Sequence, residues 1–285
     1  MLRALPAKRI RDSLSRDSLR GLSAFAVRLS LSSPQRREGT KMSLARVELR
    51  NILGCASLEI GEGEFFSFVG PSGCGKTRLL RMLAGLIPAA PGEILISGKR
   101  VTGPQTETGF IFSNPALLEW RTALRNVLLQ AEVRGLRRTA HEARARRLLA
   151  AFGLSGSEER RPCELTPYLK VCVSICRALV HEPPLLILDD AFRFVDPIAR
   201  ERILMDLQHL WMSAGTTAVL VTENIREAVQ LSDRVAVLSP HPAEVVQVFP
   251  IPLPRPRRMD KGTTPQIAEY SSRIRTLFHA QGVLP

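Results

Sequence analysis

The sequence predicts an α/β protein with a mostly parallel, doubly wound sheet and a helical subdomain beside it. Through residues 43–249, segments that read as buried strands alternate with segments whose apolar residues recur at helical spacing. A glycine-rich loop, "GPSGCGKT", separates an early apolar strand from the first of these helices. Strands that alternate with helices pair in parallel, because each helix carries the chain back across the sheet.

The expected elements follow one another with short breaks of turn residues. Residues 43–69 read as strands with a "GEGE" turn, and "TRLLRMLAGL" reads as a helix that begins directly after the glycine-rich loop. A Pro/Gly break and the strand "PAAPGEILISG" precede a mainly helical stretch, residues 116–182, which predicts the subdomain. The remainder reads as strand "PLLILDD", helix 198–214, strand "TTAVLVTE", helix "NIREAVQLS", and two closing strands, "RVAVLSP" and "EVVQVF".

The net charge of +13 is concentrated at the two ends of the chain. Residues 1–41 hold ten Lys/Arg against three acids, and residues 250–285 hold six against two, so residues 42–249 carry a net charge of only +2. Proteins that track nucleic-acid phosphates carry positive charge on the folded face that binds. The distribution therefore argues against a nucleic-acid partner.

Charge and composition divide the chain into three regions. The Arg- and Ser-rich residues 1–41 have the composition of a transit peptide or a basic surface anchor. We favour a disordered extension or an over-extended gene start, with the main domain at residues 42–249. Residues 250–285 are expected to form a basic tail with a short helix. Its segment "PRPRRMDKG" could face anionic lipid, but a solvated, proline-stiffened tail is the simpler expectation.

Five cysteines form neither a CxxC pair nor a zinc-ligand spacing. An odd number of cysteines, with no signal peptide, predicts reduced thiols and a cytoplasmic protein. Cys172 and Cys176 lie one helical turn apart, which favours a packing role. No apolar stretch reaches the roughly 18 residues needed to span a bilayer.

The glycine-rich loop fits the pattern G-x-x-x-x-G-K-[ST]. Its backbone N–H groups and the following helix N-terminus can cradle phosphates. In this pattern Lys76 reaches the β- and γ-phosphate oxygens, and the Thr77 hydroxyl binds Mg²⁺. The sequence therefore predicts a nucleoside triphosphate site, with ATP and Mg²⁺ as cofactors, whose phosphate-binding residues are Gly70, Pro71, Ser72, Gly73, Cys74, Gly75, Lys76 and Thr77.

The strand "LLILDD" ends in two carboxylates, Asp189 and Asp190, and Asp189 is expected on the Mg²⁺ side. A phosphate loop followed about a hundred residues later by such a strand, with a helical insertion between, resembles the ATP-binding subunits of ABC transporters. The segments "FSNPALLEWRTALRNV", "DRVAVLSP" and "PIPLPRPRR" resemble the nitrate, sulfonate and taurine importers over roughly residues 43–280.

This resemblance implies an ABC nucleotide-binding domain, in which a P-loop NTPase core carries antiparallel β and α-helical subdomains. It implies a head-to-tail dimer with a second copy or a related subunit, a membrane permease partner, and a place on the inner face of the cell membrane. Each ATP would lie between one chain's phosphate loop and the signature helix of the other. Asp196 matches the family's aspartate at the dimer interface, although the preceding "RFV" is atypical.

Set against the family pattern, the chain departs at positions that meet the γ-phosphate. Asp190 stands where a catalytic glutamate is expected, and its side chain is one methylene shorter. A base misplaced by about 1 Å can cost roughly 10²-fold in rate. Glu223 stands at the switch histidine, where a carboxylate can only accept a hydrogen bond and repels phosphate. Ser113 replaces a glutamine that would reach both metal and water.

The signature is also altered, to "LTPYL" at residues 165–169. Thr166 keeps a hydroxyl, Pro167 has no N–H to donate, and Tyr168 stands at a glycine position, where a side chain is expected to obstruct phosphate. Thr-Pro is nevertheless a good helix start, as N-cap and N1. The aromatic residue that would stack on adenine is missing from "LRNILGCASLEI".

Three functions fit these residues. The first is an importer subunit that binds Mg-ATP with slow or no hydrolysis. The second is a working transport ATPase that tolerates the substitutions, and the third is a scaffold insensitive to nucleotide. For the permease, Leu118 and Trp120 are candidate contacts by resemblance, against the alternative that Trp120 is buried in the helical subdomain.

Overall fold

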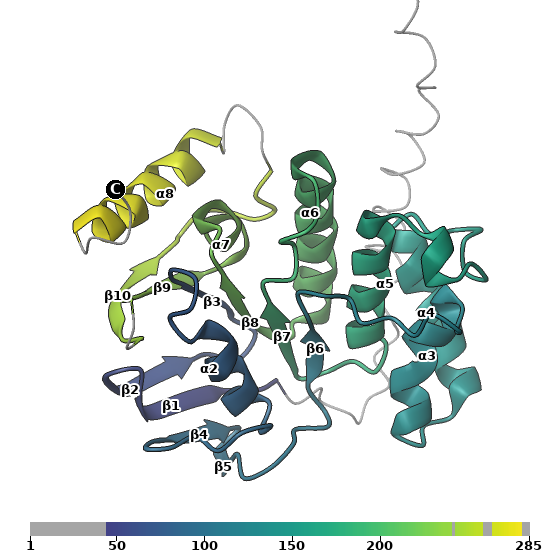
Figure 1. Cartoon of the computed structure of the whole chain (residues 1–285), viewed down its shortest axis with the longest axis horizontal. Helices are drawn as coiled ribbons and strands as arrows, with labels where there is room; N and C mark the ends of the chain where they lie inside the picture. Colours follow the sequence, from purple (N-terminus) through teal and green to yellow (C-terminus); the bar gives the residue numbers. More distant parts are fainter. Residues whose placement is uncertain (1–43, 241–242, 259–263, 281–285) are drawn as a thin grey trace, which may run out of the picture. The chain divides into compact units, whose positions relative to one another are not determined.

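The computed structural model describes residues 44–240, 243–258 and 264–280. Its central sheet has six strands in the order β10-β9-β3-β8-β7-β6 (Figure 1). The five strands from β9 to β6 run parallel, and β10 pairs antiparallel with β9. The strands are β3 (Phe65–Val69), β6 (Gly109–Ile111), β7 (Leu185–Asp189), β8 (Thr217–Thr222), β9 (Arg234–Leu238) and β10 (Val245–Pro250). The predicted, mostly parallel sheet is thus confirmed.

A second sheet is antiparallel, in the order β2-β1-β4-β5. It consists of β1 (Val47–Ile52), β2 (Cys55–Ile60), β4 (Glu93–Ile96) and β5 (Lys99–Arg100). Helix α2 (Lys76–Leu83) shares one hydrophobic cluster with β1, β4 and the central strands. This core holds the start of α2 in place relative to the strand ends.

The helical subdomain contains α3 (Ala123–Val133), α4 (Arg138–Ala151), the short 3₁₀ turn η1 (Pro162–Glu164) and α5 (Pro167–Leu179) (Figure 1). Thr122 caps α3 by accepting a hydrogen bond from Arg125 N at 3.3 Å. Thr166 caps α5 in the same way, with Pro167 at N1. The helical start predicted at "LTPYL" is therefore present. Cys172 and Cys176 are fully buried in this core, as the packing prediction requires.

Helices α6 (Pro197–Ala214) and α7 (Ile225–Leu231) follow β7 and β8. Asp196 caps α6 by accepting from Ala199 N at 3.0 Å, and Asn224 caps α7. Both β7 and β8 are buried along their whole length. The polar residues that follow these strands are therefore presented at one edge of a rigid core.

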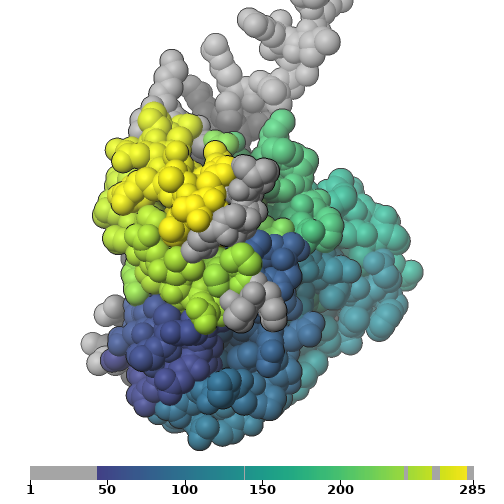
Figure 2. Space-filling view, turned by 60° about the vertical axis from the view of Figure 1, so that its left-hand side comes forward, coloured from purple at the N-terminus to yellow at the C-terminus, as the bar shows by residue number. Residues whose placement is uncertain are grey.

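The C-terminal region corrects the expectation of a solvated tail. Arg257 is only 1% exposed, and its guanidinium donates to the carbonyls of Val229, Ser232, Ile251 and Leu253 at 2.6–3.2 Å. Helix α8 (Thr264–Ala280) packs beside β10 and α7 through buried Ile267, Ile274 and Phe278. In the space-filling view this C-terminal segment, in yellow, lies against the yellow-green segment that precedes it (Figure 2). Apolar residues at helical spacing in this segment account for the docking. Residues 1–41, expected to be a separate extension, lie outside the described residues.

The alternative that Trp120 is buried is wrong, because 73% of its surface is exposed. Leu118 is partly buried. Within the described ranges, no helix combines the length and hydropathy that crossing a membrane would require.

Candidate nucleotide site

The phosphate loop connects the buried strand β3 to helix α2. A Cβ atom on Gly70 would lie 2.9 Å from Cys74 Sγ and 3.0 Å from Leu238 Cβ, so the position requires glycine. Gly75 is the N-cap of α2 with φ of 116°, a conformation that residues with a Cβ rarely adopt. Around Gly73 the space within 4 Å of a hypothetical Cβ is empty. The loop therefore leaves room at the helix N-terminus.

Lys76, the first residue of α2, folds back over the loop. Its Nζ donates to the carbonyl oxygens of Gly70 at 2.8 Å and Pro71 at 2.7 Å. The third neighbour of Nζ is Glu223 Oε1, at 3.5 Å. The lysine side chain is 8% exposed, and that of Glu223 is 37% exposed. The predicted γ-phosphate lysine and the residue at the switch position are thus in direct contact.

Thr77 and Asp189 form the second pair of the site. Thr77 Oγ1 donates to Asp189 Oδ1 at 3.0 Å, joining the start of α2 to the end of β7. Burial raises the pKa of the Asp189 carboxyl, against the lowering effect of this hydrogen bond. A hydroxyl and a carboxylate are the protein groups that face a nucleotide-bound Mg²⁺ in such sites, and phosphate oxygens and water supply its other ligands.

The described residues contain no cluster of three or more His, Cys, Asp or Glu that could bind a metal by itself. A nucleotide-bound Mg²⁺ usually keeps several waters and takes only one or two protein carboxylates. The glycine cradle, Lys76 and the Thr77–Asp189 pair fit a magnesium nucleotide. When bound, Mg²⁺ would neutralise charge on the β- and γ-phosphates.

Asp190 follows β7 with φ of 45°, in the left-handed region. Its backbone N–H donates to Val221 O at 2.9 Å, so this turn is held against β8. Its carboxylate accepts from Thr222 Oγ1 at 3.2 Å and lies 3.6 Å from Arg193 Nη1. The predicted weak base is therefore held by two side chains that sequence reasoning did not select.

Behind Asp190, the same Thr222 hydroxyl contacts Glu227 Oε2 at 3.1 Å. Glu227 is 3% exposed, and burial raises its pKa to about 7, although Arg200 at 3.2 Å opposes the shift. Sequence reasoning missed Glu227 and Arg193. A signal existed for Glu227, because an acid in the first turn after an Asn cap is common, but its burial depends on α6 packing alongside.

Ser113 and Thr166 occupy different parts of the fold. Ser113 lies two residues beyond β6, and β6 pairs in parallel with β7 so that Ile111 aligns with Leu188. Ser113 therefore lies at the same sheet edge as the two aspartates. Thr166 caps α5 in the helical subdomain, and among the described residues no hydrogen bond or ion pair joins it to the phosphate loop.

Tyr168 packs into the helical subdomain. Its side chain is half-buried and lies against the core there, beside Cys172. Burial raises the pKa of the Tyr168 phenol, which therefore stays protonated. The ring thus contributes to this core, next to the helix start formed by Thr166 and Pro167.

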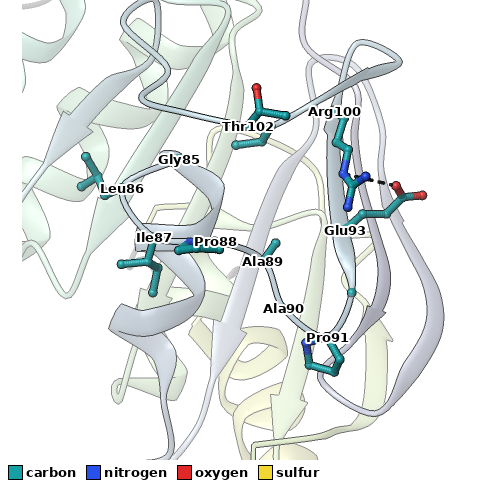
Figure 3. Close-up of a pocket in the computed structure, with 12 residues that line it drawn as sticks. Gly85, Leu86, Ile87, Pro88, Ala89, Ala90, Pro91, Glu93, Arg100 and Thr102 are labelled. Carbon is teal, nitrogen blue, oxygen red and sulfur yellow. Dashed lines mark ion pairs between the residues drawn. The ribbon is translucent and has the colours of Figure 1, made fainter.

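A cavity of about 440 Å³ lies away from these residues, between the loop after α2 and strands β4 and β5 (Figure 3). Leu86, Ile87 and Pro88 line one part of it. Arg100 and Glu93 face each other across the strands at 3.7 Å. None of the predicted site residues lines this cavity.

Comparison with known proteins agrees with this geometry. Residues 53–193 match the family model described as "ABC transporter". The chain is 36% identical over 200 residues to the taurine import ATP-binding protein of Escherichia coli O157:H7, covering 70% of this chain and 78% of the relative. It is 34% identical over 229 residues to the nitrate import ATP-binding protein of Synechococcus elongatus, and this match covers 79% of this chain and 35% of the relative. A dimeric ATP-binding cassette solved with ADP and Pi is 27% identical, with a TM-score of 0.61 over 72% of this chain and 98% of that one.

Proposed function

The chain belongs to the ABC transporter ATP-binding proteins, and from this premise we propose that it is the ATP-binding subunit of an importer for small anions or sulfonates, and that it binds Mg-ATP with slow or no hydrolysis. The observation that carries the proposal is the contrast within one site. Lys76 and the Thr77–Asp189 pair keep an arrangement suited to phosphate and magnesium. Glu223 Oε1, however, is the third neighbour of Lys76 Nζ, beside the carbonyl oxygens of Gly70 and Pro71.

Binding is assigned to the loop residues Gly70–Thr77, with Thr77, Asp189 and Ser113 on the magnesium side. Asp190 is the candidate base, and its shorter side chain supports slow chemistry. Its carboxylate also accepts from Thr222 and pairs with Arg193, so it is already engaged by two side chains of the same chain. Glu223 cannot donate a hydrogen bond to a γ-phosphate unless it is protonated.

We further propose a head-to-tail dimer in which Thr166 contacts the partner's nucleotide. In a homodimer both sites combine a poor base with an altered signature. With an intact related subunit, one site would lack the base and the other would meet "LTPYL". Both arrangements predict slow hydrolysis.

The permease surface is assigned to the exposed Trp120, with Leu118 beside it in sequence. A tryptophan that is 73% exposed is the type of anchor that interfaces use. The proposal includes a location on the cytoplasmic face of a membrane. Taurine and nitrate, named in the relatives, are consistent with a small anionic or sulfonate solute.

A working transport ATPase remains the second candidate, because Asp190 is firmly oriented at the correct strand end. A nucleotide-insensitive scaffold is disfavoured by the retained glycine geometry and the Thr77–Asp189 hydrogen bond.

A single-turnover experiment separates the three. Excess protein is mixed with trace labelled Mg-ATP, and bound nucleotide and released phosphate are followed in one sample, with Lys76→Ala as the control. Binding without phosphate release above the control supports the proposal. Release that depends on Lys76 establishes the ATPase, and absence of binding establishes the scaffold.

A further inference from the structure

Glu223 lies where a terminal phosphate would have to approach Lys76. The ammonium group has three N–H donors, and two of them are directed at the carbonyls of Gly70 and Pro71. The third neighbour is the Glu223 carboxylate. A γ-phosphate oxygen that binds Lys76 must therefore displace Glu223 or release a loop carbonyl.

The backbone on both sides of Glu223 is anchored, so displacement is limited to its side chain. Thr222 Oγ1 accepts from Asn224 N at 3.0 Å and contacts Asp190 and Glu227. The Asn224 side chain accepts from the N–H groups of the first turn of α7. Glu223 thus begins from a fixed Cα position between a buried strand and a capped helix.

The local charges oppose a further negative group. In the part of the chain that the structure describes, Lys76 is the one side chain recorded in contact with the Glu223 carboxylate. Asp189 ends the neighbouring strand β7 and Asp190 follows it. Each has its own partners, Thr77 for the first and Arg193 with Thr222 for the second. A triphosphate that separated Glu223 from Lys76 would leave this carboxylate unpaired beside the γ-phosphate.

We propose that Glu223 makes this site selective for a magnesium nucleoside diphosphate over the triphosphate. A diphosphate can use the loop N–H groups and the α2 N-terminus while Glu223 keeps its pairing with Lys76 at the terminal-phosphate position. The inference rests on the proposed nucleotide binding and assigns its preferred ligand. With this preference, the subunit holds the nucleotide as the diphosphate, the product of hydrolysis.

The repulsion between two like charges about 5 Å apart, partly screened at a side chain that is 37% exposed, corresponds to roughly tenfold in affinity. Glu223→Gln keeps the size and shape of the side chain and removes the charge. Glu269→Gln, at an exposed position on α8, removes the same charge outside the site and is the matched control.

The test is isothermal titration calorimetry of the full chain and both variants. The two probes are Mg-ADP and the magnesium complex of β,γ-imido-ATP, which avoids hydrolysis. The wild type is expected to bind Mg-ADP about tenfold more tightly than the triphosphate analogue. In Glu223→Gln this preference should fall by about tenfold, because the triphosphate analogue binds more tightly. Glu269→Gln should show the same preference as the wild type.

Equal binding of both probes by the wild type, or an equal gain for both in Glu223→Gln, overturns the selectivity and leaves the proposed nucleotide binding intact. If the wild type binds neither probe, the proposed function fails and this inference fails with it.

Discussion

The buried carboxyl of Glu227 predicts an unusual dependence of stability on pH. Burial raises its pKa to about 7 in the folded chain, from a reference value of 4.5, against the lowering effects of Arg200 and the Thr222 hydrogen bond. The charge of Asp190 raises it further, and Asn224 donates to its Oε1 at 3.0 Å. The geometry agrees, because the single Thr222 proton can satisfy two carboxylates only if one of them is protonated.

The sign and size follow from proton linkage. Between pH 4.5 and 7 the folded chain holds a proton on Glu227 that the unfolded chain has released, so the free energy of unfolding falls as the pH rises. Within this range, each pH unit lowers the free energy of unfolding by about 1.4 kcal/mol. The stabilisation is therefore fully present below pH 4.5 and is lost as the pH rises through 7, a total of about 3 kcal/mol.

Glu227→Gln isolates this contribution, because glutamine keeps an amide donor toward Thr222 and does not titrate. Urea unfolding of both proteins is measured from pH 4.5 to 7.5, and the difference between their unfolding free energies cancels other groups such as Asp206, whose pKa burial raises to about 6. The wild type should lose about 3 kcal/mol relative to the variant across this range. A difference that stays constant within 1 kcal/mol refutes the reasoning.

Three further predictions follow from the site, the C-terminal region and the surface. Asp190→Glu combined with Glu223→His should raise the single-turnover rate above that of wild type, by up to roughly 10²-fold if base placement limits the rate; an unchanged rate would identify the altered signature as limiting. Arg257→Met should lower the urea unfolding free energy by about 3 kcal/mol or more, since several buried carbonyls lose their donor, and a loss below 1 kcal/mol would contradict this account. Trp120→Ala should change stability by less than about 0.5 kcal/mol at its exposed position while weakening co-purification with the proposed permease subunit; unchanged co-purification would remove Trp120 from the interface.

The order of strands and helices could be predicted from sequence because local signals were strong and agreed with one another. The apolar runs of β7 and β8 are too short for buried helices and end in turn residues, and both proved buried throughout. The start of α5 was predictable from Thr166 and Pro167 alone, since capping depends on neighbours in sequence. The phosphate loop is equally local, which is why its position between β3 and α2 could be predicted.

The remaining features depend on contacts between distant residues. Arg257 looked like part of a solvated basic tail, but the carbonyl groups that bind it come from α7 and from the chain after β10. Tyr168 packs against the core of the helical subdomain, a contact that the residue type alone does not indicate. The Lys76–Glu223 contact joins residues 147 positions apart. No local pattern indicates such a pair.

The two substituted carboxylates at the nucleotide site each face a cation of the same chain. Glu223 lies beside Lys76, and Asp190 lies beside Arg193, in the "RFV" segment that departs from the family pattern. The Arg193 side chain is 53% exposed, so this pair is screened and contributes at most about 1 kcal/mol to stability. The Asp190–Arg193 pair therefore acts mainly on the electrostatic potential at the site and contributes little to the stability of the fold. Because each acid has a nearby cation, the negative charge at each of these two positions is offset by a side chain of the same chain.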